Sequence, residues 1–297
     1  MNNCDTSARL SRACRTNRRR RSPSIRPLIA AAGIVLLWFS LPAAAQPSTN
    51  SLVFDARLPK DASTFAPNQL TLSFAPEYYY WQENANGAKL LDESGIRYGL
   101  ELAYKQRPEK GWLVAARVKG YYGAVDYNGQ TQGGTPVKTT TDYYGGLGEF
   151  RGGYRWGLSQ AQYLDLMGGF GLEYWERSLQ GSGGYNEYWM PIYLKSGLEI
   201  SPRETGWIGA LDIKLPVYTT QTVDQSRLGG PVVVLHPAIR PGGYAEAGYQ
   251  FTKNISVVAY FDSYWFAQSP TVASGGFLFY QPESFTYQAG VKLGWTF

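Results

Sequence analysis

The chain ends in Tyr287-Gln-Ala-Gly-Val-Lys-Leu-Gly-Trp-Thr-Phe297, and these eleven residues give the clearest indication of the fold. The apolar or small residues among them fall at every second position, and the positions between hold glutamine, glycine, lysine and threonine. Successive side chains of a β-strand point to opposite faces, so a period of two predicts a strand with one apolar and one polar face.

A terminal aromatic residue on such a strand resembles the last strand of bacterial outer-membrane β-barrels. In those proteins it belongs to the signal that the barrel-assembly machinery recognises, so the resemblance implies this role for Tyr287, Trp295 and Phe297. The alternative is an edge strand of a soluble sheet, which would show the same alternation. The opposite end of the chain favours the membrane protein.

The first 45 residues have the three parts of an export signal. Arg18-Arg-Arg-Arg21 and Arg26 form a basic region, residues 28–41 form a 14-residue apolar run, and Ala43-Ala-Ala45 is a small-residue cleavage site before Gln46. The apolar run is shorter than the roughly 20 residues that a membrane-spanning helix needs.

These features predict three parts of the chain. We expect residues 1–45 to be a signal peptide, residues 46–68 a periplasmic N-terminal leader, and residues 69–297 an outer-membrane β-barrel. No apolar run of 18 residues follows residue 45, so the mature chain contains no transmembrane helix. An exported chain of this kind is either a soluble all-β protein or a closed barrel that spans the membrane.

Removal of the signal changes the charge argument. Residues 1–45 hold eight arginines and one acid, Asp5, so they carry +7 of a whole-chain net charge of +5, and the remainder is −2. The basic pI of about 9.0 belongs to the discarded segment and gives no support for nucleic-acid binding. Cys4 and Cys14 are also lost, which excludes disulfides, cysteine metal ligands and cysteine nucleophiles from the mature protein.

Ten segments have strand-like alternation and form five hairpins. The expected strands are 69–83, 95–106, 111–126, 140–156, 161–177, 186–200, 206–219, 243–252, 254–267 and 284–297. Tight turns at 107–111, 157–160, 201–205 and 252–254 alternate with longer links at 84–94, 127–139, 178–185, 220–242 and 268–283. Short periplasmic turns and longer extracellular loops are typical of outer-membrane barrels. The predicted fold is all-β, a closed antiparallel transmembrane β-barrel of about ten strands.

Aromatic residues decide which face of the strands meets lipid. Near the long links lie runs such as Tyr78–Trp81, Tyr121-Tyr122 and Tyr264–Phe266, and near the short turns lie Trp112 and Trp207. Two belts separated by aliphatic residues match the aromatic girdles at the two lipid interfaces, so the apolar faces should point outward.

Two prolines interrupt the predicted strands. Pro191 and Pro216 lie in the upper parts of their strands, and a closed barrel has no free edge for them. We therefore expect a local bulge or a break in the hydrogen-bond ladder at these positions.

The charged residues on the polar faces are candidates for a role in the lumen. Eight are basic and eight are acidic: Arg97, Glu101, Lys105, Arg117, Lys119, Glu149, Arg151, Asp165, Glu173, Lys195, Glu199, Asp212, Lys214, Glu246, Asp262 and Lys292. One interpretation is a mutually neutralising network that fills a narrow barrel, because buried charges must be paired. The other is a polar pore, which small residues on the same faces, such as Gly169 and Gly171, would leave open.

The ten-strand count also resembles the omptin proteases, which carry a paired-Asp motif on one outer loop and an Asp-x-His motif on another. The single histidine, His236, lies in a predicted outer loop, but Val234 stands where the aspartate would be, and the loop after the third strand offers only Asp126. The dyads that would activate water are missing. His236 has no serine close by in sequence and makes no metal site alone. We expect no enzyme activity, no cofactor and no metal.

Two functions are consistent with this sequence. One is a structural barrel or a porin-like, charge-lined narrow channel for a small solute. The other is a surface-exposed binding barrel whose aromatic-rich loops at 220–242 and 268–283 bind a glycan or host ligand. Either would reside in the outer membrane of a Gram-negative bacterium, in contact with outer-membrane lipid and lipopolysaccharide, would meet the barrel-assembly machinery during biogenesis, and would bind no nucleic acid.

Overall fold

The computed structural model describes residues 68–130, 134–181 and 183–297 of the chain. The predicted signal peptide and nearly all of the predicted leader lie outside these residues. Among these residues, the structure contains no helix with the length and hydrophobicity of a membrane span.

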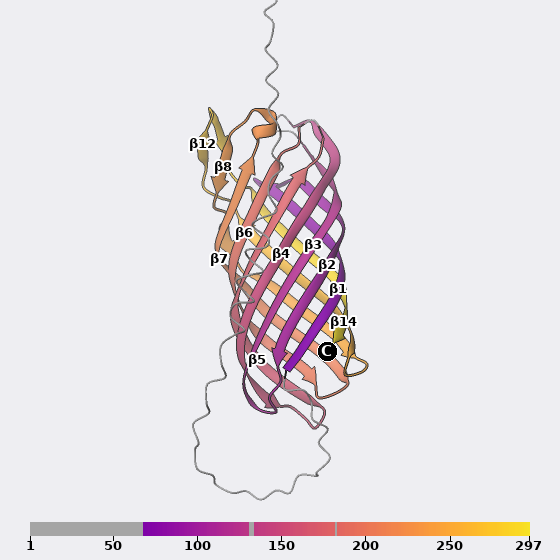
Figure 1. Ribbon diagram of the computed structural model, residues 1–297. Helices are drawn as coiled ribbons and strands as arrows, with labels where there is room; N and C mark the ends of the chain where they lie inside the picture. The colour runs from indigo at the N-terminus through magenta and orange to yellow at the C-terminus, as the bar shows by residue number, and fades with distance from the viewer. Residues whose placement is uncertain (1–67, 131–133, 182) are drawn as a thin grey trace, which may run out of the picture. The chain divides into compact units, whose positions relative to one another are not determined.

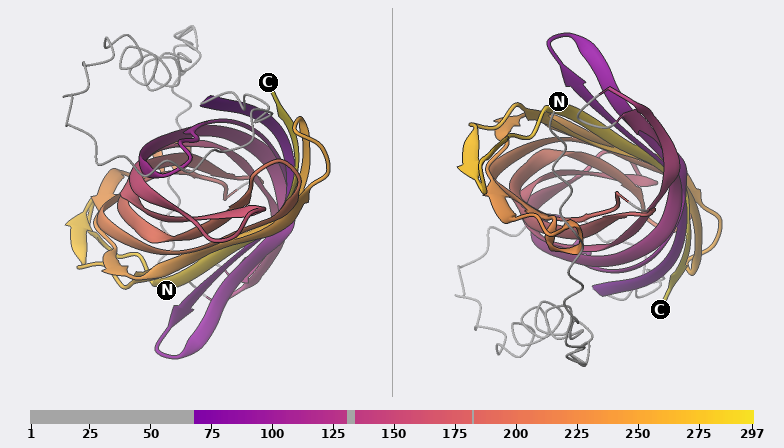
Figure 2. Two further views of the ribbon diagram at one scale, coloured as in Figure 1. Left: turned by 90° about the horizontal axis from the view of Figure 1, so that it is seen from below. Right: turned by 90° about the horizontal axis from the view of Figure 1, so that it is seen from above.

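Ten long strands pair antiparallel with their neighbours (Figure 1). They are β1 (Asn68–Ala85), β2 (Ala88–Gln106), β3 (Gly111–Gln130), β4 (Pro136–Gly157), β5 (Gln162–Leu179), β6 (Asn186–Pro202), β7 (Gly206–Asp224), β10 (Gly242–Gln250), β11 (Ile255–Ala267) and β14 (Glu283–Thr296). The last strand, β14, pairs with β1 and closes the ring seen end-on in Figure 2. The predicted closed antiparallel β-barrel is confirmed.

The two longest predicted loops contain regular structure that the sequence pattern did not reveal. Between β7 and β10 lie the 3-10 turn η2 (Ser226–Leu228) and the short strands β8 (Val232–Leu235) and β9 (Ala238–Arg240). β8 extends the sheet beside the upper part of β7, and β9 pairs with β11. Between β11 and β14, β12 (Val272–Ser274) and β13 (Phe277–Phe279) form a separate hairpin.

The expected loop at 84–94 is wrong, because β1 and β2 are joined by a two-residue turn. Asn86 and Gly87 have φ values of 52° and 77°. A tight hairpin turn of this hand requires positive φ at both central residues, and Asn-Gly is the pair that adopts it most readily. β2 therefore begins at Ala88 instead of residue 95, and the hairpin carries seven more residues of paired strand on that side.

Side chains alternate along the long strands between an inward buried set and an outward exposed set. On β7, Leu211 and Ile213 are 71% and 67% exposed, whereas Asp212 and Lys214 are 2% and 0% exposed. A soluble sheet protein would bury the aliphatic residues and expose the charges. The outer surface is thus the apolar one, which is the arrangement that the two aromatic belts predicted.

Both prolines disturb the ladder as expected. Tyr193 pairs with Pro216 and Ile192 pairs with Tyr218, so Val217 is an extra residue and β7 has a bulge there. On the other side of β6, pairing with β5 is interrupted at Pro191, between the pairs Leu172–Ile192 and Trp175–Trp189. A proline has no N–H to donate, so the strand must break its ladder or bulge at such positions.

Candidate functional site

All sixteen charged residues predicted for the lumen have their side chains inside the ring. Eleven are buried, and the other five, Lys105, Arg117, Glu199, Glu246 and Lys292, are partly buried. With the exception of Glu173, each forms at least one ion pair with another described residue. They come from nine of the ten long strands, all except β1, so the lumen is lined by charges of both signs.

A layer of ion pairs crosses the lumen near the short turns. Lys105 of β2 lies 2.7 Å from Asp165 of β5 and also bonds Glu199 of β6. Arg155 of β4 holds Asp165 with two hydrogen bonds of 2.7 Å, in the fork geometry that suits a guanidinium and a carboxylate. Beside this layer lies a polar cavity of about 180 Å³, which is also lined by Gln69.

The middle layer joins opposite walls directly. Arg117 of β3 binds Glu149 of β4 through Nε and Nη2, at 2.5 and 2.8 Å. Its Nη1 donates to the Tyr244 hydroxyl of β10 at 3.1 Å, and Lys292 of β14 lies 3.3 Å from that hydroxyl. In the ring, β3 and β10 are five strands apart in either direction, so Arg117 and Tyr244 meet across the full width of the barrel.

A third layer, toward the long-loop end, is aromatic. Trp81 of β1 and Trp189 of β6 are fully buried and in edge contact, with ring centroids 5.1 Å apart. These two strands also lie on opposite sides of the ring. Phe266 of β11 packs on Trp189 at 5.2 Å, and Trp175 stacks on Trp189 at 5.6 Å. The lumen is therefore bridged here by ring contacts.

The aromatic layer corrects the prediction that whole runs of aromatic residues lie in the outer girdle. Neighbouring residues of a strand point to opposite faces, so only alternate members reach the lipid side. The members that point inward and are buried are Tyr79, Trp81, Tyr121, Tyr143, Trp175, Trp189, Tyr264 and Phe266. Their neighbours Tyr78, Tyr122, Tyr144, Tyr174 and Trp265 are exposed on the outside.

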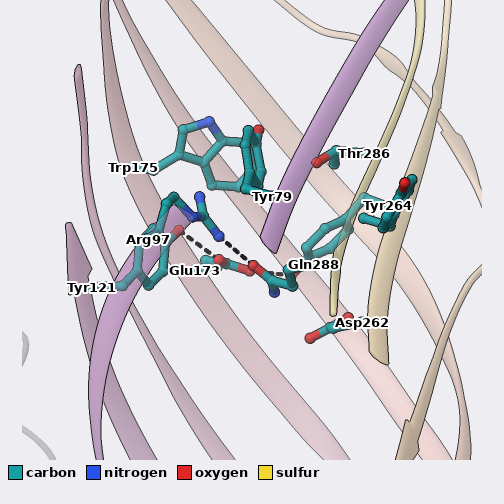
Figure 3. Close-up of a pocket in the computed structure, with 10 residues that line it drawn as sticks. Tyr79, Arg97, Tyr121, Glu173, Trp175, Asp262, Tyr264, Thr286 and Gln288 are labelled. Atoms are coloured by element: carbon teal, nitrogen blue, oxygen red, sulfur yellow. Dashed lines mark hydrogen bonds between the residues drawn. The ribbon is translucent and has the colours of Figure 1, made fainter. Parts of the chain in front are cut away.

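Glu173 differs from the other predicted lumen acids because its carboxylate accepts hydrogen bonds from tyrosines instead of forming an ion pair with another described residue. The hydroxyls of Tyr121 and Tyr264 each donate a hydrogen bond of 2.6 Å to its carboxylate, and no ion pair reaches it from the described residues. Glu173, Arg97 and Asp262 line a cavity of only about 10 Å³ (Figure 3). That space is about the size of one water molecule and too small for a solute.

Some buried charged residues escaped the sequence prediction. Arg177 binds Glu93 and Glu187 at 2.6 and 2.8 Å, and Glu77 binds Arg97 at 2.6 Å. Glu93 fell in the expected loop at 84–94, which the Asn86-Gly87 turn removes. Glu77, Arg155 and Arg177 continue the period of two in their strands, so a stricter use of the alternation would have found them.

His236 occupies no catalytic arrangement within the described part of the chain. Its Nδ1 lies 3.3 Å from the backbone oxygen of Thr219, and its ring lies 5.9 Å from that of Tyr218. No group of three or more His, Cys, Asp or Glu side chains among the described residues could hold a metal ion.

Comparison with known proteins identifies the fold. No protein-family model matches the sequence, and no curated protein matches it. Among solved structures, the outer membrane protease OmpT from Escherichia coli is similar over 80% of this chain and 99% of its own, with a TM-score of 0.50 at 12% identity. The match with the Pseudomonas putida toluene transporter TodX covers 78% of this chain and 90% of the TodX chain, with a TM-score of 0.34 at 9% identity. The match with the Yersinia pestis protein Ail covers 78% of this chain and 100% of the Ail chain, with a TM-score of 0.32 at 10% identity. By its fold, this chain is a closed antiparallel β-barrel that is similar to the barrel of OmpT.

Proposed function

We propose that this protein is a non-conducting outer-membrane barrel that acts as a surface-exposed binding module. The observation that carries the proposal is direct contact between opposite walls at two levels, Arg117 with Tyr244 and Trp81 with Trp189. A channel needs a continuous aqueous path, and side chains that touch across the full diameter obstruct it. The functional surface is then the long-loop end, which is outside the cell.

The energetics of the interior support a permanently closed barrel. Opening a path would separate buried ion pairs such as Lys214 and Asp262. Their side chains are 0% and 3% exposed, and Lys214 Nζ lies 2.6 Å from Asp262 Oδ1. Breaking a buried ion pair costs about 3–5 kcal/mol when one charge is left uncompensated. Several such pairs would have to break together, so the lumen serves as a polar core and holds the outer elements rigidly.

The proposal includes how the chain is exported and which surroundings the barrel meets. Cleavage before Gln46 would deliver the chain to the periplasm, and the barrel-assembly machinery would read the terminal strand with Tyr287, Trp295 and Phe297. The outward aliphatic band would then contact outer-membrane lipid and lipopolysaccharide. We assign no catalytic step. In an Asp-x-His motif the aspartate would stand two residues before His236, and this chain has Val234 there.

The second candidate is a narrow channel for a small solute, and the polar cavity of about 180 Å³ near the short turns favours it. That cavity would be the entrance of a path that opens only when the layers above it rearrange.

Liposome swelling distinguishes the two candidates. Mature protein is refolded into vesicles, which are then placed in isosmotic solutions of sugars of increasing size. We expect no swelling above empty vesicles even for the smallest sugar, because the central layers obstruct solute passage. Swelling that falls with sugar size would favour the channel.

A further inference from the structure

The hairpin of β12 and β13 has an edge that no other strand covers. β13 pairs with β12 alone, in a two-stranded sheet separate from the barrel. The turn between them is Gly275-Gly276, with φ values of 59° and 82°. Figure 1 places the hairpin at the long-loop end, and Figure 2 shows it at the outside of the strand ring.

The register of the hairpin says which backbone groups are free. In a two-residue hairpin, the residues that flank the turn exchange both backbone hydrogen bonds, which here are Ser274 and Phe277. The next pair, Ala273 and Leu278, is the non-hydrogen-bonded kind. The N–H and C=O of Leu278 therefore point away from β12, toward the open edge.

Apart from the short length of β13, three residues, the edge lacks the features that usually prevent strand pairing. Natural edge strands carry lysines, inward charges or prolines, or are covered by other elements. Residues 268–282 contain no charged residue, and their two prolines, Pro270 and Pro282, lie outside the paired strands. Phe277 and Leu278 are 61% and 72% exposed, which is high for apolar side chains outside the lipid-facing band.

The hairpin is held in place, so the exposed edge is a formed surface. Phe279 is buried in a cluster with Val223, Val233 and Leu235, which belong to β7 and β8. At the base of the hairpin, the N–H of Ser269 donates to the Gln281 oxygen at 3.0 Å, and the N–H of Gln281 donates to Ser269 Oγ at 2.8 Å. A preorganised edge loses little entropy when a partner binds.

We propose that the open edge of β13 binds an extended, uncharged segment of another protein, which adds to the hairpin as a third strand. The proposal rests on the proposed function, since it names the partner class of a surface-binding barrel. The outward N–H and C=O of Leu278 are the groups that a strand added to β13 would bond, and main-chain hydrogen bonds of this kind give strand addition its affinity. The absence of charge from residues 268–282 favours an apolar segment and gives a charged ligand no counter-ion there.

The test uses the refolded mature protein in detergent and a fluorescent peptide of alternating threonine and valine with blocked ends. Binding is read by fluorescence anisotropy. A second peptide has the same side chains but is N-methylated at every residue, so neither of its edges can donate hydrogen bonds. We expect the unmodified peptide to bind and the methylated peptide to bind at least about tenfold more weakly. A tenfold change in Kd corresponds to about 1.4 kcal/mol of binding free energy.

Two variants of the protein at Leu278 test the same hydrogen bonds from the side of β13. Leu278→Pro removes the N–H at the open edge and no ladder bond within the hairpin, so it should weaken binding about tenfold. The matched control Leu278→Thr keeps the N–H and a β-favouring side chain, so it should stay within about threefold of wild type.

Four results would overturn the proposal. They are equal binding of the methylated peptide, wild-type affinity in Leu278→Pro, no binding of either peptide, and a self-association in ultracentrifugation that Leu278→Pro abolishes, which would make a second copy the occupant. Conductance is independent of these readings. A barrel that conducts and also binds the peptide contradicts the closed lumen and leaves the edge site standing.

Discussion

At the scale of single residues, the alternation of apolar and charged side chains predicts which way a side chain points, but not which residue it meets. Asp165 is buried inside the ring, and its partners Arg155 and Lys105 come from two other strands, β4 and β2. Lys105 reaches Glu199, which is 94 residues further along the chain. Such pairings depend on the tilt and stagger of the closed ring, which a local pattern does not encode.

Two neighbouring residues test the assignment of faces. Leu166→Arg places a cation on the outer face, where it should cost about 2–4 kcal/mol near mid-bilayer. Asp165→Asn leaves Arg155 and Lys105 short of a buried counter-charge and should cost about 3–5 kcal/mol. The measurement is equilibrium unfolding by guanidinium in lipid vesicles.

The exposed Asp126→Asn is the control and should stay within about 0.5 kcal/mol of wild type. If Leu166→Arg leaves stability unchanged, the outward face does not contact lipid.

At the scale of elements, the sequence predicted ten strands and their order but misjudged their ends. The predicted link at 84–94 is polar in composition, and its Asn86-Gly87 pair was not recognised as a tight turn. The runs of aromatic residues were treated as blocks, although a strand divides each run between lipid and lumen. In both cases the rule that decides the structure is local and was available from the sequence.

The turn between β1 and β2 gives the second prediction. Gly87→Ala places a Cβ at φ 77°, which costs about 1–2 kcal/mol although no atom lies within 4 Å of the new group. The control is Gly148→Ala in β4, where the Cβ also has open space and φ is not in that region, so no loss of stability is expected. Equal unfolding midpoints for the two variants would argue against a strained turn.

The terminal strand gives the third prediction. Phe297 is 67% exposed, and its backbone N–H bonds Leu70 at 2.9 Å, so its ring contributes little to packing. Phe297→Ala should nevertheless reduce the amount of barrel in outer-membrane fractions severalfold, because we propose that the assembly machinery recognises the ring before the barrel folds. Tyr122→Ala, another exposed aromatic, should not.

The two variants should refold alike from urea into detergent, which separates assembly from stability. Equal membrane levels of both in cells would count against the terminal signal.

At the scale of the whole molecule, the closed barrel followed from composition, strand number and the two ends of the chain. What stayed open from sequence was whether the lumen conducts, because balanced charges suit both a filled interior and a pore. The structure adds the contacts between opposite walls, and these depend on which strands face each other after closure. The similarity to the fold of OmpT, with a TM-score of 0.50 at 12% identity, shows that very different sequences can form a similar barrel.

Planar-bilayer recording on refolded mature protein tests the closed lumen most directly. Insertion is verified by protection of the strands from protease, and current is recorded in molar salt over a range of voltages. The contacts Arg117–Tyr244 and Trp81–Trp189 predict a flat baseline without discrete steps. Steady single-channel steps from the wild-type protein would contradict the non-conducting barrel.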